Sequence, residues 1–337
     1  MIARRLLALV VAFVVAWPAA AQHEWYASGS KERSVRFSGA EGVALSGTLL
    51  LPAVSEIQRV PGVVLIAGSG PTDRNGNNPL VHTRIDTLKL VAERLAQARI
   101  ATLRYDKRGI GASTPTPRTL EEQERFFTWQ NLVGDVQAAQ AELLQHDEIK
   151  PYATALLGHS EGGDLALAAA GTARIRPHAI VLASTPGLTL EEIIRRQLAR
   201  SHPTLVPAAD LAMAAIRATG RVPADVPPEL TRLFPAYVGP YLKGALAFDP
   251  AQALAVLDIA CLLVHGAADK QVVPLGDIQP LLDVLAKRKA PGEVMIAPGV
   301  SHNLKRVFGP TDPGFSGPLA PSVADKIATW LVSVLGA

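Results

Sequence analysis

The spacing of apolar residues changes along the chain between a period of two and a helical period, and this predicts its secondary structure. Residues 33–37 and 43–51 indicate an opening pair of antiparallel strands. Buried strands and helices are then expected to alternate, which predicts an α/β fold with a mostly parallel sheet and helices on both faces. The strands are expected at residues 63–67, 101–105, 153–158, 179–183, 260–265 and 292–297, and the helices at residues 88–97, 132–144, 165–171 and 320–335.

This pattern is interrupted between residues 185 and 250. Strand-like runs vanish there, prolines recur, and only short helical runs remain. The interruption predicts a helical insertion between two parts of one α/β core, residues 22–184 and residues 251–337. The helical runs of the insertion are expected at residues 190–200 and 208–219.

The first 21 residues have the three parts of a secretory signal peptide. Two arginines, Arg4 and Arg5, precede an apolar run at residues 6–17, and three alanines form an A-x-A cleavage site that ends at Ala21, before Gln22. The apolar run is too short to span a bilayer comfortably, and no stop-transfer segment follows it. We therefore expect export across a bacterial inner membrane and a periplasmic or secreted mature protein, without stable membrane insertion.

Charge and cysteine content narrow the function further. Removal of the signal peptide takes away two arginines and no acid, which lowers the formal net charge from +3 to +1. A nearly neutral protein has no strong attraction to nucleic acid or anionic lipid, so neither is an expected partner. The single cysteine, Cys261, excludes an intrachain disulfide, and its place in an apolar strand predicts inert packing. The oligomeric state stays open.

The strongest chemical signal is the sequence Gly-His-Ser-Glu-Gly-Gly at residues 158–163. It lies between a predicted strand and a predicted helix, and strand, G-x-S-x-G, helix is the setting in which a serine becomes a nucleophile. The sharp turn would hold Ser160 in a strained conformation with its hydroxyl exposed. Gly158 and Gly162 have no Cβ atoms, which would otherwise collide in such a turn. Ser160 is therefore the candidate nucleophile.

A serine hydroxyl is a poor nucleophile without a general base and an acid that orients the base. His302 follows the predicted strand at residues 292–297 and is the candidate base. Asp269 follows the predicted strand at residues 260–265 and is the candidate acid. Each would lie in a loop at the carboxyl end of a strand, in the chain order Ser, Asp, His, which is the order of the α/β-hydrolases.

The loop after the predicted strand at residues 63–67 agrees with this interpretation. It contains Gly-Ser-Gly-Pro at residues 68–71 and Asp-Arg-Asn-Gly at residues 73–76. Together with the Ser160 motif, these loops resemble the α/β-hydrolase superfamily, and more narrowly bacterial exported esterases and acyl hydrolases. The resemblance covers roughly residues 33–337. It implies that the backbone N–H groups of Ser69 and Glu161 form the oxyanion hole, and that the insertion caps the active site.

These residues predict a serine hydrolase that cleaves a small carboxylic ester through an acyl-enzyme and needs no cofactor. His302 would take the proton of Ser160 as the serine attacks the carbonyl, while Asp269 keeps the imidazole in the correct tautomer. The N–H groups of Ser69 and Glu161 would bind the oxyanion. The Glu161 carboxylate would oppose that charge unless it turned away or paired with a base. The resemblance favours an ester of modest acyl length.

Other activities remain open on the same residues. A peptidase or a thioesterase could use this triad, and a peptidase could anchor a substrate amine on Asp210, Asp225 or Glu229 of the insertion. A catalytically silent binding protein could also have this scaffold, although the complete triad argues against it. No metal-ligand cluster such as H-E-x-x-H or C-x-x-C occurs, so no metal site is predicted.

The remaining polar residues near these motifs are expected to have structural roles. His159 should pack beside the turn, and His265 should end its strand in the interior. Two glutamates with capping-box spacing should start helices rather than act as catalytic acids. The expected ion pairs join Asp106 to Arg108 and Asp73 to Arg74, and the expected capping boxes join Thr119 to Glu122 and Thr189 to Glu192.

Overall fold

The computed structural model describes residues 29–53 and 58–337, so the predicted signal peptide lies outside the described residues. Among these residues, eight strands form one sheet in the order β1-β2-β4-β3-β5-β6-β7-β8. β1 pairs with β2, and β2 with β4, in antiparallel fashion, whereas all other neighbours are parallel. This confirms the predicted mostly parallel sheet. The strands are β1 (Lys31–Ser38), β2 (Ala44–Leu51), β3 (Val60–Ile66), β4 (Ala101–Tyr105), β5 (Ile149–His159), β6 (Ala179–Ala183), β7 (Ala260–Gly266) and β8 (Gly292–Ala297).

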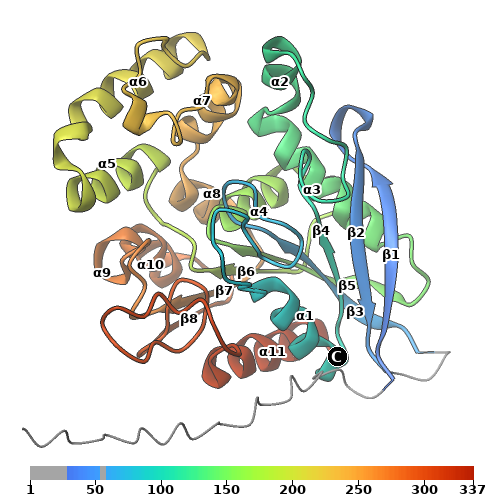
Figure 1. Cartoon of the computed structure of the whole chain (residues 1–337). Coiled ribbons are helices and arrows are strands. Elements are labelled where there is room, and N and C mark those ends of the chain that lie inside the picture. Colours follow the sequence, from blue (N-terminus) through green and yellow to red (C-terminus); the bar gives the residue numbers. More distant parts are fainter. Residues whose placement is uncertain (1–28, 54–57) are drawn as a thin grey trace, which may run out of the picture.

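Helices cover both faces of the sheet, as Figure 1 shows. α1 and α11 pack on one face, and α3, α4, α8 and α10 pack on the other. None of the helices in the described part of the chain is long and apolar enough to cross a membrane. Their bounds are α1 (Thr87–Gln97), α2 (Leu120–Phe126), α3 (Trp129–Leu143), α4 (Glu161–Thr172), α8 (Pro250–Val256), α9 (Pro274–Asp277), α10 (Gln279–Lys287) and α11 (Pro321–Leu335).

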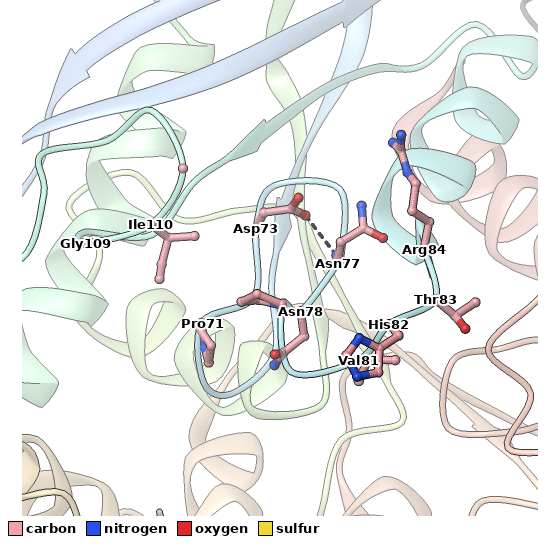
Figure 2. Close-up of a pocket in the computed structure, with 12 residues that line it drawn as sticks. Pro71, Asp73, Asn77, Asn78, Val81, His82, Thr83, Arg84, Gly109 and Ile110 are labelled. Atoms are coloured by element: carbon pink, nitrogen blue, oxygen red, sulfur yellow. Dashed lines mark hydrogen bonds between the residues drawn. The ribbon is translucent and has the colours of Figure 1, made fainter.

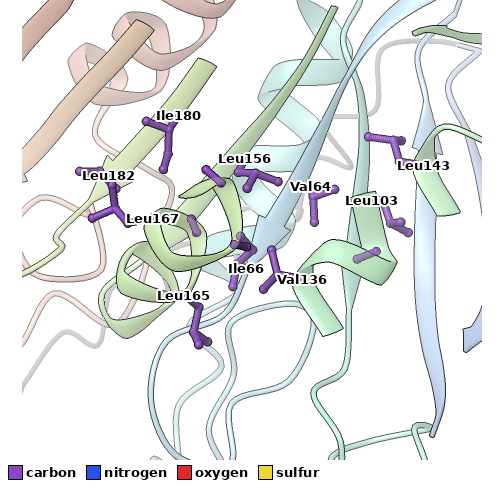
Figure 3. Close-up of a cluster of buried hydrophobic side chains, with 14 of the residues drawn as sticks. Val64, Ile66, Leu103, Val136, Leu143, Leu156, Leu165, Leu167, Ile180 and Leu182 are labelled. Atoms are coloured by element: carbon purple, nitrogen blue, oxygen red, sulfur yellow. The ribbon is translucent and has the colours of Figure 1, made fainter. Parts of the chain in front are cut away.

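The two helical layers explain why β3 and β6 are apolar at every position. Successive side chains of a strand point to opposite faces, so a strand covered on both sides buries all of them. In β3, Val64 and Ile66 join the cluster beneath α3 and α4, which Figure 3 shows. Val63 and Leu65 join the cluster beneath α1 and α11. All four side chains are 0% exposed.

Several predicted boundaries move by a few residues. β4 and β6 have the predicted bounds, but α4 begins at Glu161 rather than at residue 165. The helix therefore includes Gly162 and Gly163. Both have low helix propensity, but the turn at Ser160 leads directly into the helix and overrides it. Both predicted capping boxes are confirmed, at the starts of α2 and of α5 (Leu190–Ser201).

Helices also fill the segment between β6 and β7. Besides α5 and α8, it contains α6 (Val206–Thr219), α7 (Gly239–Ala247) and short 3-10 turns. This insertion has an apolar cluster of its own, in which Met213 and Ile216 of α6 meet Phe234 and Leu242. Figure 1 shows α5, α6 and α7 grouped beside the sheet rather than on either of its faces. The 3-10 turns are η2 (Pro203–Leu205), η3 (Pro228–Leu230) and η4 (Ala236–Val238), and another, η1 (Ala40–Gly42), joins β1 to β2.

The two predicted loop ion pairs were wrong in their partners. Asp106 pairs with Arg74 (Nη2 to Oδ2, 2.6 Å), and Arg108 pairs with Asp135 of α3 (Nη2 to Oδ1, 2.7 Å). Asp73 instead accepts backbone N–H groups of its own loop. Residues adjacent in a loop point their side chains in different directions, so partners from other elements replaced the expected neighbours. These pairs brace the loops after β3 and β4 against each other and against α3.

Candidate active site

Ser160 occupies a sharp turn between β5 and α4. Its φ of 56° and ψ of −127° lie in a region that non-glycine residues rarely adopt. The Ser160 N–H donates to the carbonyl of Ala183 in β6 (2.8 Å), and the Ser160 carbonyl accepts the N–H of Gly163 (2.8 Å). The side chain is partly exposed, and its hydroxyl has no hydrogen bond to any described residue. The turn therefore presents this hydroxyl at the carboxyl end of the sheet.

Three glycines let the chain make this turn. A Cβ at Gly158 would collide with the backbone of Gly162, and a Cβ at Gly162 would collide with the carbonyl of Ile66. A Cβ at Gly163 would strike the side chain of Thr185. The turn thus lies pressed between β3 and the segment after β6.

We expect Gly162→Ala to lower the free energy of unfolding by about 3 kcal/mol or more. The new Cβ would collide with the backbone carbonyl oxygens of Ile66 and Ala67, and backbone groups cannot rotate away as a flexible side chain can. Urea denaturation measures this loss. Gly171→Ala in the same helix is the matched control, because its new Cβ would meet nothing within 4 Å. That variant should be neutral or stabilised by about 0.5–1 kcal/mol. Equal stability of Gly162→Ala and Gly171→Ala would show that the close approach is not needed.

The structure brings His302 and Asp269 together. The Nδ1 of His302 lies 2.7 Å from the Asp269 Oδ2, and both side chains are buried. The Asp269 Oδ1 accepts the backbone N–H groups of Gln271 (2.8 Å) and Val272 (3.0 Å). Burial by itself would raise the pKa of Asp269, but hydrogen bonds from His265 and His302 hold it well below its ordinary value. The ionised carboxylate therefore keeps the proton of a neutral His302 on Nδ1 and leaves Nε2 as a base.

His265 is a second histidine beside Asp269, a contact that was not predicted from the sequence. It ends β7 in the interior, as expected, and is fully buried. Its Nε2 lies 2.7 Å from the carbonyl oxygen of Val272 and 3.2 Å from the Asp269 Oδ2. Both neighbours are acceptors, so the ring carries its proton on Nε2. The four-residue spacing from Asp269 was the signal in the sequence, because the intervening loop folds back on the strand end.

Two hydrogen bonds hold the segment of His302, one from the residue before Ser160 and one from the segment after β6. The carbonyl oxygen of His302 accepts from the Nε2 of His159 (2.8 Å) and from the Oγ of Ser184 (2.8 Å). The two imidazole rings are 4.9 Å apart between centroids. Burial and the nearby His302 lower the pKa of His159 to about 4, so this ring is neutral at pH 7 and donates through Nε2. The structure thus ties the two loops together, although Ser160 and His302 share no side-chain hydrogen bond.

Ser69 and Glu161 place two backbone N–H groups beside this turn. A Cβ on Gly68 would lie 3.2 Å from the Cβ of Ser160, so the loop after β3 touches the turn at Ser160. Neither the Ser69 N–H nor the Glu161 N–H has a hydrogen-bond acceptor among the described residues. The carbonyl oxygen of Ser69, in contrast, accepts a hydrogen bond from the Oγ1 of Thr72 (2.8 Å). Two free donors next to one serine are the requirement for an oxyanion hole.

A cavity of about 530 Å³ adjoins the loop of Ser69. Figure 2 shows it between the loop that carries Pro71, Asn78 and His82 and the loop that carries Ile110. The same figure shows Asp73 bonded to the N–H of Asn77 (2.8 Å), so this carboxylate is occupied in holding the cavity wall. The cavity is lined by the loop after β3 and by the loop of Ile110, but not by Ser69, Ser160, Glu161 or His302.

The other candidate residues lie in the insertion. Asp210 pairs with Arg195 (2.6 Å), whereas Asp225 and Glu229 are exposed. Within the described residues, no group of three or more His, Cys, Asp or Glu side chains is placed to hold a metal ion.

Solved structures with the same fold include hydrolases of several kinds. The α/β hydrolase GrgF from Penicillium sp. sh18 is 22% identical, with a TM-score of 0.58 over 91% of this chain and 100% of that chain. Acetyl xylan esterase 1 from Thermoanaerobacterium sp. JW/SL YS485 is 14% identical, with a TM-score of 0.56 over 91% and 84%. A puromycin-hydrolysing peptidase of Mycobacterium tuberculosis is 20% identical, with a TM-score of 0.58 over 91% and 40%. At these identities the likeness shows the fold alone.

Sequence comparison gives a closer placement. No curated protein sequence matches the chain. The sequence model of the family described as serine aminopeptidase, S33, matches residues 81–306, which is more than half of the chain. The match includes Glu161 and the three residues Ser160, Asp269 and His302, while Ser69 precedes it. The chain therefore belongs to the serine aminopeptidase S33 family and has the α/β-hydrolase fold.

Proposed function

We propose that this chain is a serine hydrolase that cleaves small carboxylic esters through an acyl-enzyme. The observation that carries the proposal is the 2.7 Å contact between the His302 Nδ1 and the Asp269 Oδ2, in a loop tied to the residue before Ser160. That contact leaves the Nε2 of His302 as the free base. The strained turn at Ser160 and the free N–H groups of Ser69 and Glu161 supply the other parts of an acyl-transfer site.

Each step of the reaction has a residue to perform it. His302 accepts the Ser160 proton as Oγ bonds to the ester carbon, and the two N–H groups stabilise the oxyanion. The ester C–O bond then breaks, and the alcohol leaves with the proton from His302. Water, deprotonated by His302, hydrolyses the acyl-serine and releases the acid. The insertion at residues 185–250 would cap the site.

An aminopeptidase is the second candidate, because the family model that matches is that of serine aminopeptidases. Such an enzyme needs a carboxylate that binds the free amine of its substrate. Of the three candidates in the insertion, Asp210 is occupied by Arg195, and the other two are exposed.

A substrate panel on the mature protein tests the choice. We expect the kcat/KM for p-nitrophenyl esters of short acids to exceed that for aminoacyl p-nitroanilides and acyl thioesters. A higher kcat/KM for the aminoacyl amides would establish the peptidase, and a higher value for thioesters would establish a thioesterase. A fluorophosphonate probe should label the wild type at Ser160. Absence of labelling in folded protein would favour a catalytically silent binding protein.

We also propose that the enzyme is exported and processed. Arg4, Arg5 and the apolar run at residues 6–17 support this, together with the small residues that end at Ala21. Mass spectrometry of the protein from a bacterial periplasm should find an N-terminus at Gln22, or its cyclised form. A membrane-bound product that retains Arg4 and Arg5 would contradict periplasmic localisation.

A further inference from the structure

Lys107 is a buried, positively charged residue that has no role in the reaction proposed above. It directly follows Asp106, in the loop after β4, and is 8% exposed. Its neighbours in the chain, Asp106 and Arg108, form ion pairs, but Lys107 forms none with any described carboxylate at 4 Å or closer. Its Nζ instead donates to the carbonyl oxygen of Gly68 at 2.5 Å. A buried ammonium is unfavourable unless its contacts offset the loss of water.

One opposing charge that acts on Lys107 is the carboxylate of Glu161, the residue after Ser160. Burial lowers the pKa of Lys107, and the Glu161 carboxylate counteracts that shift. Burial raises the pKa of the Tyr241 hydroxyl in α7, and the charge and hydrogen bonding of the Glu161 carboxylate raise it further. Glu161 thus lies within electrostatic range of both Lys107 and Tyr241. A positive charge at Lys107 would offset part of the repulsion between the Glu161 carboxylate and an oxyanion.

The contact with Gly68 constrains the N–H group that would bind the oxyanion. The carbonyl of Gly68 and the N–H of Ser69 belong to one planar trans peptide, so they point in opposite directions. Fixing the carbonyl toward Lys107 fixes the N–H on the other side. The α-carbon of Gly68 lies against Ser160, where its absent Cβ would be 3.2 Å from the serine Cβ. The next carbonyl, of Ser69, is held by Thr72. Rotation of this peptide would break the Lys107 contact.

We propose that Lys107 is a positioning residue of the oxyanion hole, which holds the peptide between Gly68 and Ser69 so that the Ser69 N–H points at the developing oxyanion. Glu161 then contributes the second N–H of the hole. The inference rests on the proposed function, because it requires Ser69 to be an oxyanion donor. The effect belongs to the transition state, since a ground-state ester carbonyl carries little of the charge that the N–H stabilises.

Lys107→Met tests the proposal, because methionine has similar length but neither charge nor a donor. Loss of one oxyanion donor costs about 10²–10³ in kcat, and a donor that is misdirected rather than removed should cost about 10- to 100-fold. KM for a p-nitrophenyl ester should stay within about threefold, since ground-state binding does not use the hole. Phenylboronic acid, which forms a tetrahedral adduct on the serine, should bind more weakly by about the factor lost in kcat.

Arg288→Met is the matched control. Arg288 also donates to backbone carbonyls, those of Leu257 and Ile259, but it does so before β7, at the opposite end of the sheet from the catalytic loops. This variant should lose stability while the folded fraction keeps the wild-type kcat and boronate affinity. Lys107→Gln is the second variant in case Lys107→Met does not fold. Glutamine is one bond shorter than lysine and uncharged, so it should also weaken boronate binding.

The outcomes separate this proposal from the proposed function. Wild-type boronate affinity in a folded Lys107→Met or Lys107→Gln variant would overturn the positioning role while leaving the hydrolase standing. An equal loss of kcat in Arg288→Met would overturn it too, because the effect would then follow general destabilisation. If the wild type itself neither bound boronate nor hydrolysed any ester, the proposed function would be wrong.

Discussion

Ser160→Ala is expected to abolish ester hydrolysis while leaving the fold intact. Removal of the nucleophile should lower kcat by about 10⁴- to 10⁶-fold. The strained turn should survive, because alanine keeps the Cβ and the hydroxyl makes no hydrogen bond to a described residue. Steady-state kinetics with p-nitrophenyl esters measures the loss, and thermal denaturation should give an unchanged Tm.

The control for this variant is Thr185→Ser, which changes a hydroxyl side chain that packs against Gly163 without touching the nucleophile. It should keep wild-type turnover. Wild-type esterase activity in Ser160→Ala would show that another residue is the nucleophile. Fluorophosphonate labelling followed by peptide mapping would then identify that residue.

The second large effect is expected for Asp269→Asn. The substitution should lower kcat by up to about 10⁴-fold, because an amide at this position favours the wrong tautomer of His302. KM should change little, since Asp269 lies behind the imidazole and is buried. The loss should shrink as the pH rises, if hydroxide partly replaces the general base. A pH series of kcat for the variant and the wild type measures both effects.

The control for Asp269→Asn is Asp283→Asn, because Asp283 is exposed on α10 and contacts only Gln279 there. Asp277 is not suitable as a control position. Its side chain is buried and accepts from Arg196 (3.0 Å) and from the N–H of Val273 (2.8 Å). Wild-type activity in Asp269→Asn, with a large loss in another acid-to-amide variant, would assign the orienting acid elsewhere.

Asp269 should also contribute to stability in a way that depends on pH. Its pKa is lower in the folded protein than in the unfolded chain, so the unfolded chain binds the proton more readily. The stabilising contribution is therefore present above the unfolded pKa of about 3.9 and is lost as the pH falls through the folded value. The stability difference between the wild type and Asp269→Asn should accordingly be largest near neutral pH and decrease in acid.

The local pattern of apolar residues and glycines was enough to predict the order of helices and strands and the candidate residues Ser160, Asp269 and His302. A strand covered on both faces is mostly apolar, which makes β3, β6, β7 and the second half of β5 visible as apolar runs. The turn at Ser160 needs glycines at fixed offsets, so it is recognisable from a few consecutive residues. Asp269 and His302 follow because loops at the carboxyl ends of neighbouring parallel strands meet at one edge of the sheet.

Only the tertiary structure decided which charged and polar groups are partners. Arg74 was assigned to Asp73 beside it, but the fold pairs it with Asp106 from another loop. The contact of His265 with Asp269 and that of Lys107 with Gly68 depend on how segments after different strands approach each other. Secondary structure arises from repeated local patterns, whereas a single buried contact between distant residues leaves no periodic trace in the sequence. The sequence by itself therefore determined the scaffold and the candidate nucleophile, acid and base, and the packing of the loops decided what surrounds them.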